Sequence, residues 1–233
     1  MDLAARWREV RLRAIGRGDY FRLTPGLYAL YRTVGRLAPT CLRGRLLDAG
    51  AGEGAWRPLL AQYGDVVAVD LASAARSEVA GDLKQLPFAD EAFDAAFCAQ
   101  VLEHEREPAA VVAELYRVLR PGAKLLLTAP HLSRLHDLPH DYYRFTDEGL
   151  RALAAAAGFD VKTTERAGGL LSFLGHNLFS FGLAVFGPIP VFGGLARAAA
   201  KLLSPAGAAL DRLLDRRGRF ALNWVLEARK GDA

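Results

Sequence analysis

The chain has 233 residues, of which 52% are hydrophobic and 24% are charged, and its formal net charge is +4. These figures are typical of a globular protein with one main core, and they exclude a disordered tail or a collagen-like fibre. Residues 1–45 carry a formal charge of +7 and residues 167–233 carry +4, whereas residues 46–166 carry −7. Because the centre of the chain is acidic, a nucleic-acid partner is not expected.

The two cysteines, Cys41 and Cys98, form neither a disulfide framework nor a paired-cysteine metal motif. We therefore expect both to be small core residues in a cytoplasmic protein. No secretory signal is expected, since Asp2 and the arginines from Arg6 onward interrupt any apolar run near the start.

Apolar residues recur every three to four positions over residues 2–15 and 27–38, which predicts two amphipathic helices. From Arg45 onward the pattern changes to short apolar runs that alternate with helical stretches. These runs lie at residues 46–48, 66–70, 93–97 and 124–128. Such a pattern is typical of a parallel sheet that is covered by helices on both faces.

Two helices between these runs have clear boundaries. One is predicted to begin at Pro108 and to end at the Arg120-Pro121-Gly122 sequence. The other is predicted to follow a capping Thr146 and to end at Gly158. Two further strands are expected at residues 159–164 and 220–230.

A glycine-rich turn follows the first predicted strand. It contains Asp48, Gly50, Gly52 and Gly54, and glycines at such a turn let a ligand approach the backbone closely. Asp70 lies at the end of the next strand, where a carboxylate would bind ribose hydroxyl groups. This pattern alone also fits a dinucleotide, so an NAD-dependent oxidoreductase is left open.

Several segments in series resemble the class I S-adenosylmethionine-dependent methyltransferases, in particular the small-molecule type 11 branch. They are the glycine turn, Asp70, and residues 81–88, 93–94, 101–104 and 117–122. The resemblance covers about residues 44–165 and resumes at the last strand. It implies an α/β fold with a seven-stranded Rossmann-like sheet whose last strand is antiparallel, and S-adenosyl-L-methionine as the cofactor.

The resemblance also implies roles for single residues. Asp70 would bind the ribose, Asp82 and the Leu83 amide would bind the adenine, and Gln100 would lie under the methionine portion. Asp48 is compatible with the cationic amino acid end of such a ligand, whereas a carboxylate at this position would repel a pyrophosphate.

Residues 130–145 form the densest polar and aromatic stretch and resemble an acceptor-binding loop. The candidate substrate residues in it are His136, His140, Tyr142, Tyr143 and Arg144. His131, directly after the fifth strand, and His104 are the candidate catalytic residues, with a structural, hydrogen-bonded histidine as the alternative for His104. No metal site is expected, since His136, His140 and Asp141 lack a helix that would fix them.

A general base is not essential to the predicted reaction. Methyl transfer is an in-line displacement at a carbon that the cofactor's sulfonium already activates. Positioning can supply about 7 to 11 kcal/mol, whereas a general base supplies about 3 to 5 kcal/mol.

Thirty residues without a formal charge lie between Arg166 and Arg197, which is long enough to span a bilayer. Predicted strands of one sheet flank the segment, so the chain must return to the side that it left. We therefore expect residues 167–219 to form a helical insert, either a lid, a re-entrant hairpin or an interfacial anchor. Contact with the inner face of the membrane, with a second subunit in a homodimer and with the acceptor are the alternatives.

The predicted organisation is an N-terminal helical lid at residues 1–45 and a methyltransferase domain at residues 46–233 that contains the insert. The predicted function is methyl transfer from S-adenosylmethionine to a small apolar or aromatic acceptor, with oxygen favoured over nitrogen or carbon. The rival functions are an NAD-dependent oxidoreductase, a non-catalytic S-adenosylmethionine-binding protein and a membrane-associated scaffold.

Overall fold

The structure is a computed structural model that describes residues 3–16, 18–71, 78–186, 190–215 and 218–232. The chain divides into two compact units. The sheet unit consists of residues 34–165 and 224–233, and the helical unit consists of residues 1–33 and 166–223. The whole of the predicted insert, residues 167–219, thus belongs to the same unit as residues 1–33, whereas residues 34–45 of the N-terminal segment belong to the sheet unit.

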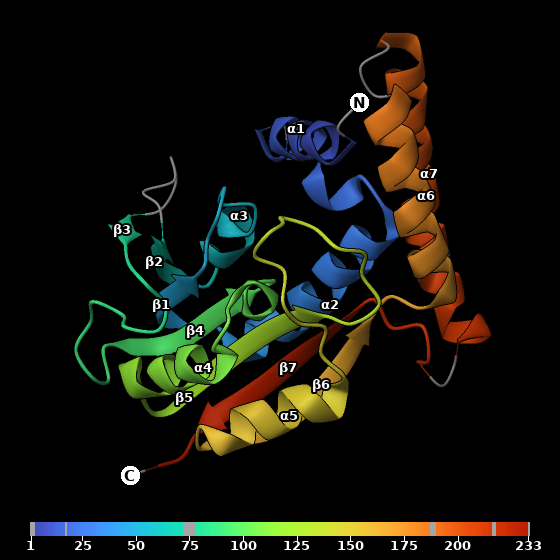
Figure 1. Cartoon of the computed structure of the whole chain (residues 1–233). Helices are drawn as coiled ribbons and strands as arrows, with labels where there is room; N and C mark the ends of the chain where they lie inside the picture. The colour runs from blue at the N-terminus through green and yellow to red at the C-terminus, as the bar shows by residue number, and fades with distance from the viewer. Residues whose placement is uncertain (1–2, 17, 72–77, 187–189, 216–217, 233) are drawn as a thin grey trace. The chain divides into compact units, whose positions relative to one another are not determined.

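Seven strands form a sheet in the order β3-β2-β1-β4-β5-β7-β6 (Figure 1). Their bounds are Gly44–Ala49 (β1), Gly64–Asp70 (β2), Val79–Ala80 (β3), Phe93–Ala99 (β4), Leu119–Pro130 (β5), Phe159–Ala167 (β6) and Asn223–Lys230 (β7). The pairs from β3 to β5 are parallel, and the last strands are antiparallel. The predicted fold class is therefore confirmed.

Three α-helices and one 3-10 helix lie wholly within the described part of the sheet unit. They are α3 (Arg57–Leu60), α4 (Pro108–Val118), α5 (Asp147–Ala156) and η2 (Leu102–His104). The second half of α2 (Pro25–Cys41), residues 34–41, also belongs to this unit. The apolar stripe of α4 is fully buried in the core of this unit, together with side chains from β4 and β5. α5 begins as predicted, since the Thr146 hydroxyl accepts a hydrogen bond from the Gly149 amide at 3.0 Å.

Several strand boundaries differ from the sequence prediction, including those of β5 and β7. β5 begins at Leu119, directly after α4, because Leu119 already pairs with Phe93 of β4. The Arg-Pro-Gly sequence therefore ends the helix but lies within the strand, where a register shift and a φ of 76° at Gly122 accommodate it. β7 begins at Asn223, three residues later than predicted.

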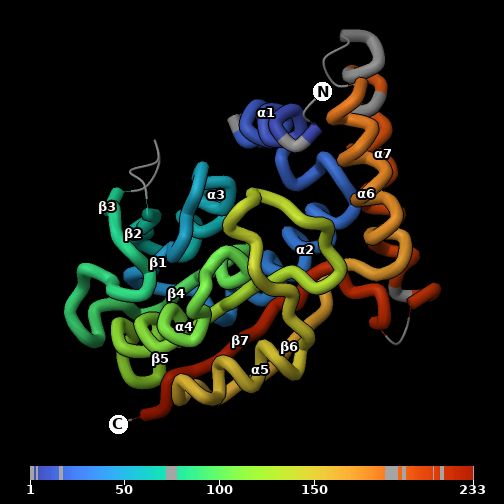
Figure 2. Tube along the Cα trace, in the orientation of Figure 1, coloured from blue at the N-terminus to red at the C-terminus, as the bar shows by residue number. Residues whose placement is uncertain are grey.

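The helical unit contains α1 (Leu3–Gly16), η1 (Tyr20–Arg22), the first half of α2 (Pro25–Cys41), α6 (Leu170–Phe186) and α7 (Pro190–Leu214). α6 and α7 lie side by side as a hairpin (Figure 2). Asp211 of α7 joins them, because its carboxylate accepts hydrogen bonds from the amides of Gly169, Leu171 and Ser172 at the start of α6. The predicted helical insert is confirmed.

Trp7, Leu23 and Leu183 pack together in the core of the helical unit. Among the described residues, no helix is both long enough and apolar enough to cross a membrane. Cys41 and Cys98 are both buried, and neither forms a disulfide.

Candidate active site

The candidate cofactor residues follow the ends of neighbouring strands in the sheet unit. β1 ends at Ala49, β2 at Asp70, β4 at Ala99 and β5 at Pro130. Since these strands are parallel neighbours, their carboxyl ends lie along one edge of the sheet. In open α/β sheets this edge is where ligands bind.

The glycine turn after β1 depends on left-handed backbone conformations. Gly50, Gly52 and Gly54 have φ values of 76°, 51° and 71°. A Cβ on Gly50 would lie 2.3 Å from a methyl carbon of Val101, whereas a Cβ on Gly52 would meet nothing within 4 Å. The Gly50 position therefore needs glycine for space as well as for conformation.

Asp70 holds the turn against β2. Its Oδ2 accepts a hydrogen bond of 2.7 Å from the Gly52 amide, while the Gly50 and Ala51 amides donate to the Val69 carbonyl. The predicted ribose carboxylate and the predicted glycine loop are thus in direct contact. This contact fixes the loop at the end of the strand.

Asp48 lies near the end of β1, directly before the turn, and is buried, with 3% of its surface exposed. Burial raises the pKa of its carboxyl to about 7, the nearby Asp70 also raises it, and Arg57 lowers it. The neutral form therefore predominates in the folded protein below about pH 7, whereas an unfolded aspartate is ionised above about pH 4.

This raised pKa makes stability depend on pH. Between about pH 4 and pH 7 the folded state binds one proton more at Asp48 than the unfolded state does. The contribution of Asp48 to the free energy of unfolding therefore falls by about 1.4 kcal/mol per pH unit as the pH rises. We expect urea unfolding at pH 5 and pH 7 to show a smaller loss of stability for Asp48→Asn than for the wild type. Asp65→Asn, at an exposed position of β2, should keep the wild-type difference. Equal pH dependence of wild type and Asp48→Asn would contradict this prediction.

Asp82, Leu83 and Gln100 line the same edge of the sheet. Asp82 Oδ1 accepts a 2.9 Å hydrogen bond from the Lys84 amide, and this bond, aided by the Lys84 ammonium, lowers the pKa of Asp82. Leu83 is buried. Gln100 has a φ of 58°, its amide donates to the Thr128 carbonyl, and its side-chain nitrogen donates to the Thr128 hydroxyl. A non-glycine residue in this conformation costs about 1 to 3 kcal/mol and is often found at a functional site.

The predicted acceptor-binding segment, residues 130–145, forms a loop from residue 131 onward, directly after β5, and an internal ion pair holds this loop together. Arg144 donates through both terminal nitrogens to the Asp141 carboxylate, at 2.6 and 2.7 Å. Burial opposes the ionisation of Asp141, but the hydrogen bonds from Arg144 and from the His136 amide outweigh it and lower the pKa of Asp141 to about 2. A bidentate pair of this kind restricts the loop to one conformation.

Two tyrosines and one histidine tie the loop to η2 and the residues after it. The amides of Tyr142 and Tyr143 donate to the Glu103 carbonyl at 2.7 and 3.3 Å. The Tyr142 hydroxyl accepts a hydrogen bond from Arg106, and the His140 Nδ1 lies 2.9 Å from the same hydroxyl. Of the predicted substrate residues, His140, Tyr142 and Arg144 therefore have hydrogen-bond partners within the loop. The hydroxyl of Tyr143 donates to the Arg106 carbonyl outside it.

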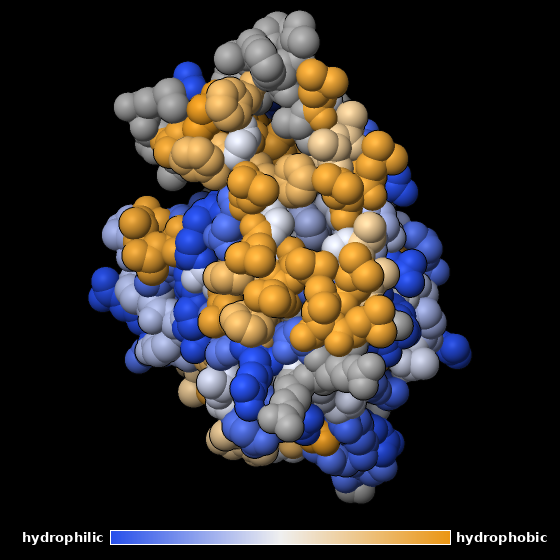
Figure 3. Space-filling view, turned by 90° about the vertical axis from the view of Figure 1, so that its right-hand side faces the viewer, coloured by the Kyte–Doolittle hydropathy of each residue, from blue (hydrophilic) through white to orange (hydrophobic). Residues whose placement is uncertain are grey.

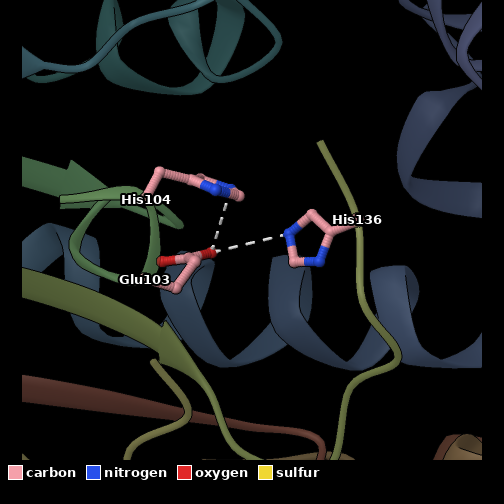
Figure 4. Close-up of side chains that lie close together, drawn as sticks. All are labelled: Glu103, His104 and His136. Atoms are coloured by element: carbon pink, nitrogen blue, oxygen red, sulfur yellow. Dashed lines mark ion pairs between the residues drawn. The ribbon is translucent and has the colours of Figure 1, made fainter. Parts of the chain in front are cut away.

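Glu103, His104 and His136 form a cluster between η2 and this loop (Figure 4). The Nε2 atoms of both histidines lie 3.8 Å from Glu103 Oε1, and the two rings meet edge to face. Neither carboxylate oxygen of Glu103 has a hydrogen-bond partner in the described part of the chain, although the side chain is fully buried. Burial raises the pKa of Glu103 to about 8 and lowers the pKa of His136.

Within the described residues, Glu103, His104 and His136 are the group with the geometry to hold a metal ion. The loose set of His136, His140 and Asp141 does not form, because His140 turns to Tyr142 and Asp141 pairs with Arg144. Glu103 was not among the site residues predicted from the sequence. Its position next to His104 does not by itself indicate that its carboxylate lies near two histidine rings. His131 lies apart from this cluster, half-buried, with its ring centre 6.2 Å from that of Trp224.

The family comparison covers this same part of the fold. Residues 47–127, from β1 to β5, match a family described as a methyltransferase domain. The matched residues thus include the glycine turn, Asp70, Asp82 and the residues that follow β4.

Two curated relatives are similar to part of the chain. A probable S-adenosylmethionine-dependent methyltransferase of Mycolicibacterium smegmatis is 32% identical over 146 residues, which cover 55% of this chain and 57% of that protein. The demethylmenaquinone methyltransferase of Renibacterium salmoninarum is 38% identical over 94 residues, which cover 36% of this chain and 40% of that protein. The chain therefore spans about half the length of these relatives. They do not favour the NAD-dependent alternative.

A likeness to a solved structure extends beyond the matched residues 47–127. The 1,6-didemethyltoxoflavin-N1-methyltransferase of Burkholderia thailandensis, with its acceptor and S-adenosylhomocysteine bound, has a TM-score of 0.55 and 19% sequence identity. The likeness covers 98% of this chain and 89% of that one. At this level of identity, the likeness shows the class I methyltransferase fold.

Proposed function

We propose that the protein transfers the methyl group of S-adenosylmethionine to a small apolar or aromatic acceptor. The observation that carries this proposal is the contact between the glycine turn and Asp70 within a matched methyltransferase domain. Asp70 would hold the ribose, Asp82 and the Leu83 amide the adenine, and Gln100 the methionine portion. When bound, the cofactor supplies a methyl group that its sulfonium has already activated.

Charge in the turn supports a sulfonium cofactor over a dinucleotide. Asp48 lies in β1 directly before the turn, where its ionised form would repel a pyrophosphate, and Asp70 adds a second carboxylate at the same edge. The ammonium group of the cofactor's amino acid end has the opposite charge. Ligand binding would then favour the ionised form of Asp48.

The acceptor is proposed to bind beside residues 131–145, with oxygen as the favoured methylated atom. The proposed acceptor residues remain His136, His140, Tyr142, Tyr143 and Arg144. Arg144 would act by holding the loop through its ion pair with Asp141. One relative is named a demethylmenaquinone methyltransferase, and this name supports a small-molecule acceptor. His131 and His104 are the proposed bases, although in-line transfer requires positioning before it requires a base.

Calorimetric titration of the full chain with S-adenosylhomocysteine and with NAD tests the cofactor proposal. We expect binding of the first ligand at one site per chain and no binding of the second. Incubation with S-adenosylmethionine and a panel of phenols and quinols should then add one methyl group to an acceptor, read by mass spectrometry. NAD binding without S-adenosylhomocysteine binding would overturn the proposal, and cofactor binding without transfer to any acceptor would favour the non-catalytic alternative.

The helical unit has an exposed apolar face on α6 and α7 (Figure 3). On α6, Leu174, Leu178 and Phe181 follow one another at spacings of four and three residues, so they lie on one stripe. A second stripe on α7 contains Leu195, Leu202, Leu203, Leu210, Leu213 and Leu214. We call these two stripes the leucine face.

We infer that the leucine face binds the surface of an anionic bilayer. The helical unit contains fourteen basic and five acidic residues, a formal charge of +9, so its charge is opposite to that of anionic lipid. Burying one exposed leucine side chain contributes about 1.5 to 3 kcal/mol. Apolar contact and charge together therefore favour lipid over an uncharged partner surface.

We expect the wild-type protein to float with vesicles that contain phosphatidylglycerol. Replacing both Leu178 and Leu202 with aspartate, at positions 69% and 76% exposed, should weaken this binding by about 100-fold or more. Leu135→Asp, at an equally exposed leucine of the sheet unit, is the matched control and should float like the wild type.

Wild-type protein that stays with the soluble fraction would contradict the membrane proposal. A dimer by light scattering that the two aspartates dissociate would instead assign the leucine face to a homodimer contact.

A further inference from the structure

We propose that Glu103, His104 and His136 bind one divalent metal ion of the zinc class. The three ligand atoms lie within 4.8 Å of one another, and they come from two segments, η2 and the loop at residues 131–145. The site does not depend on the proposed methyl transfer. The three ligands and the contacts that support them all lie in the sheet unit.

The histidine ring nitrogens that face Glu103 are in the form that a metal needs. His104 Nδ1 lies 2.6 Å from the His140 carbonyl, which can only accept a hydrogen bond, so Nδ1 carries the proton. In a neutral imidazole the lone pair is then on Nε2. This is the nitrogen that lies 3.8 Å from Glu103 Oε1.

His136 has the same arrangement. Its Nδ1 lies 3.2 Å from the Arg134 carbonyl. Arg144 Nη2 is 3.4 Å away, but its two hydrogens are directed to Asp141 at 2.7 Å and to the Arg134 carbonyl at 2.8 Å. His136 Nδ1 therefore carries the proton and donates, and its Nε2 presents a lone pair to Glu103.

Glu103 completes the set of three acceptors. Its side chain is fully buried, both oxygens lack a partner, and Figure 4 shows the carboxylate directed toward the two rings. Buried carboxylate oxygens without a donor are rare in folded proteins. A cation between the three atoms would satisfy all of them at once.

Distances and donor types favour zinc over magnesium or calcium. Two ligands at about 2.1 Å from a tetrahedral zinc ion lie about 3.4 Å apart. The two 3.8 Å separations from Glu103 Oε1 therefore need to close by a few tenths of an ångström, and the two histidine nitrogens, which lie within 4.8 Å of each other, by up to about 1.4 Å. Two imidazoles and one carboxylate suit zinc, whereas magnesium and calcium prefer oxygen ligands. Both rings also donate their second nitrogen to a backbone carbonyl, which is the usual support for metal-binding histidines.

The proposed ion would have two consequences for the site. It would tie the loop at residues 131–145 to the end of β4, where the Tyr142 and Tyr143 amides already hold it. Three protein ligands also leave a fourth position for water or for an oxygen of another molecule. With its Nε2 bound to metal, His104 could not accept a proton, so His131 would be the remaining candidate base.

Zinc binding by the full chain tests the proposal directly. Untagged protein is freed of metal with a chelator and titrated with zinc chloride in a calorimeter. We expect one zinc ion per chain, and the visible absorption of tetrahedral Co²⁺ when cobalt replaces zinc. Glu103→Gln and His136→Asn should each weaken zinc binding by about 100-fold or more, since loss of a supporting residue alone costs about 10- to 100-fold.

His140→Ala is the matched control, because it removes a histidine of the same loop whose ring lies outside the cluster and leaves the carbonyl that accepts from His104. It should keep the wild-type affinity for zinc. Circular dichroism of each variant shows whether it is folded. Wild-type protein that binds no stoichiometric zinc, or folded Glu103→Gln and His136→Asn variants that bind it as tightly as the wild type, would overturn the proposal.

Discussion

Replacing Asp70 with alanine is expected to weaken the binding of S-adenosylhomocysteine by about 100-fold or more. Two hydrogen bonds from ribose hydroxyls to a charged acceptor contribute about 1.5 to 3 kcal/mol each, and each 1.4 kcal/mol is a factor of ten in affinity. The substitution also removes the acceptor of the Gly52 amide, so the glycine turn loses its contact with the end of β2. Titration calorimetry of the variant measures the combined effect.

Two further variants separate these contributions. Asp70→Asn keeps an oxygen that can accept from the Gly52 amide but removes the charge, so it should lose less affinity than the alanine variant. Asp65→Ala changes an exposed aspartate at the other end of the same strand and should bind like the wild type. An unchanged dissociation constant for Asp70→Ala would place the sugar elsewhere, and the proposed cofactor site would then be wrong.

Gly50→Ala is expected to destabilise the protein far more than Gly52→Ala. Both substitutions force alanine into a left-handed conformation, which costs about 1 to 2 kcal/mol. Only at Gly50 does the new methyl group also collide with Val101. Overpacking of this kind costs about 1 to 3 kcal/mol more. We expect urea denaturation to show a loss of about 2 to 5 kcal/mol for Gly50→Ala, with loss of S-adenosylhomocysteine binding.

A rescue variant tests the physical cause. Val101→Ala removes the two methyl carbons that a Cβ at position 50 would approach at 2.3 and 3.2 Å. In the Gly50→Ala background it should therefore restore part of the lost stability, whereas in the wild type it should cost stability. Equal losses for Gly50→Ala and Gly52→Ala, with no rescue, would show that close packing against Val101 does not matter.

The fold was predictable because its signals are local. Short apolar runs, Pro108 at the start of one helix and Thr146 before another all act within a few residues, and the structure confirms each of them. The start of β5 was not predictable. Arg120, Pro121 and Gly122 normally interrupt a strand, and only the pairing of Leu119 with Phe93 on the neighbouring strand shows that it continues.

The candidate cofactor residues were accessible from sequence for a related reason. Parallel strands bring their carboxyl ends to one edge, so Asp70 and Gly50 could be placed near each other from strand order alone. The contact between Asp70 and the Gly52 amide is consistent with this expectation. The roles of these residues in ligand binding stay predictions until the titrations are done.

The Glu103 cluster was not accessible in this way. Residues 131–145 contain three histidines, and nothing in their spacing indicates that His136, rather than His131 or His140, folds back onto the end of β4. That choice depends on Arg144 and Asp141, which fix the loop, and on the two tyrosine amides that bind the Glu103 carbonyl. A buried carboxylate without a partner is likewise a property of the folded chain.

The place of α6 and α7 between β6 and β7 has a consequence for how such a protein can change. β6 and β7 are neighbours in the sheet, so the chain leaves and re-enters the same border, far in strand order from β1 and β2. Insertions or deletions between Ala167 and Asn223 can then be accommodated without altering the register of the strands that carry the glycine turn and Asp70. This segment can therefore be replaced, in evolution or by engineering, with one of different length or polarity while the rest of the sheet is kept.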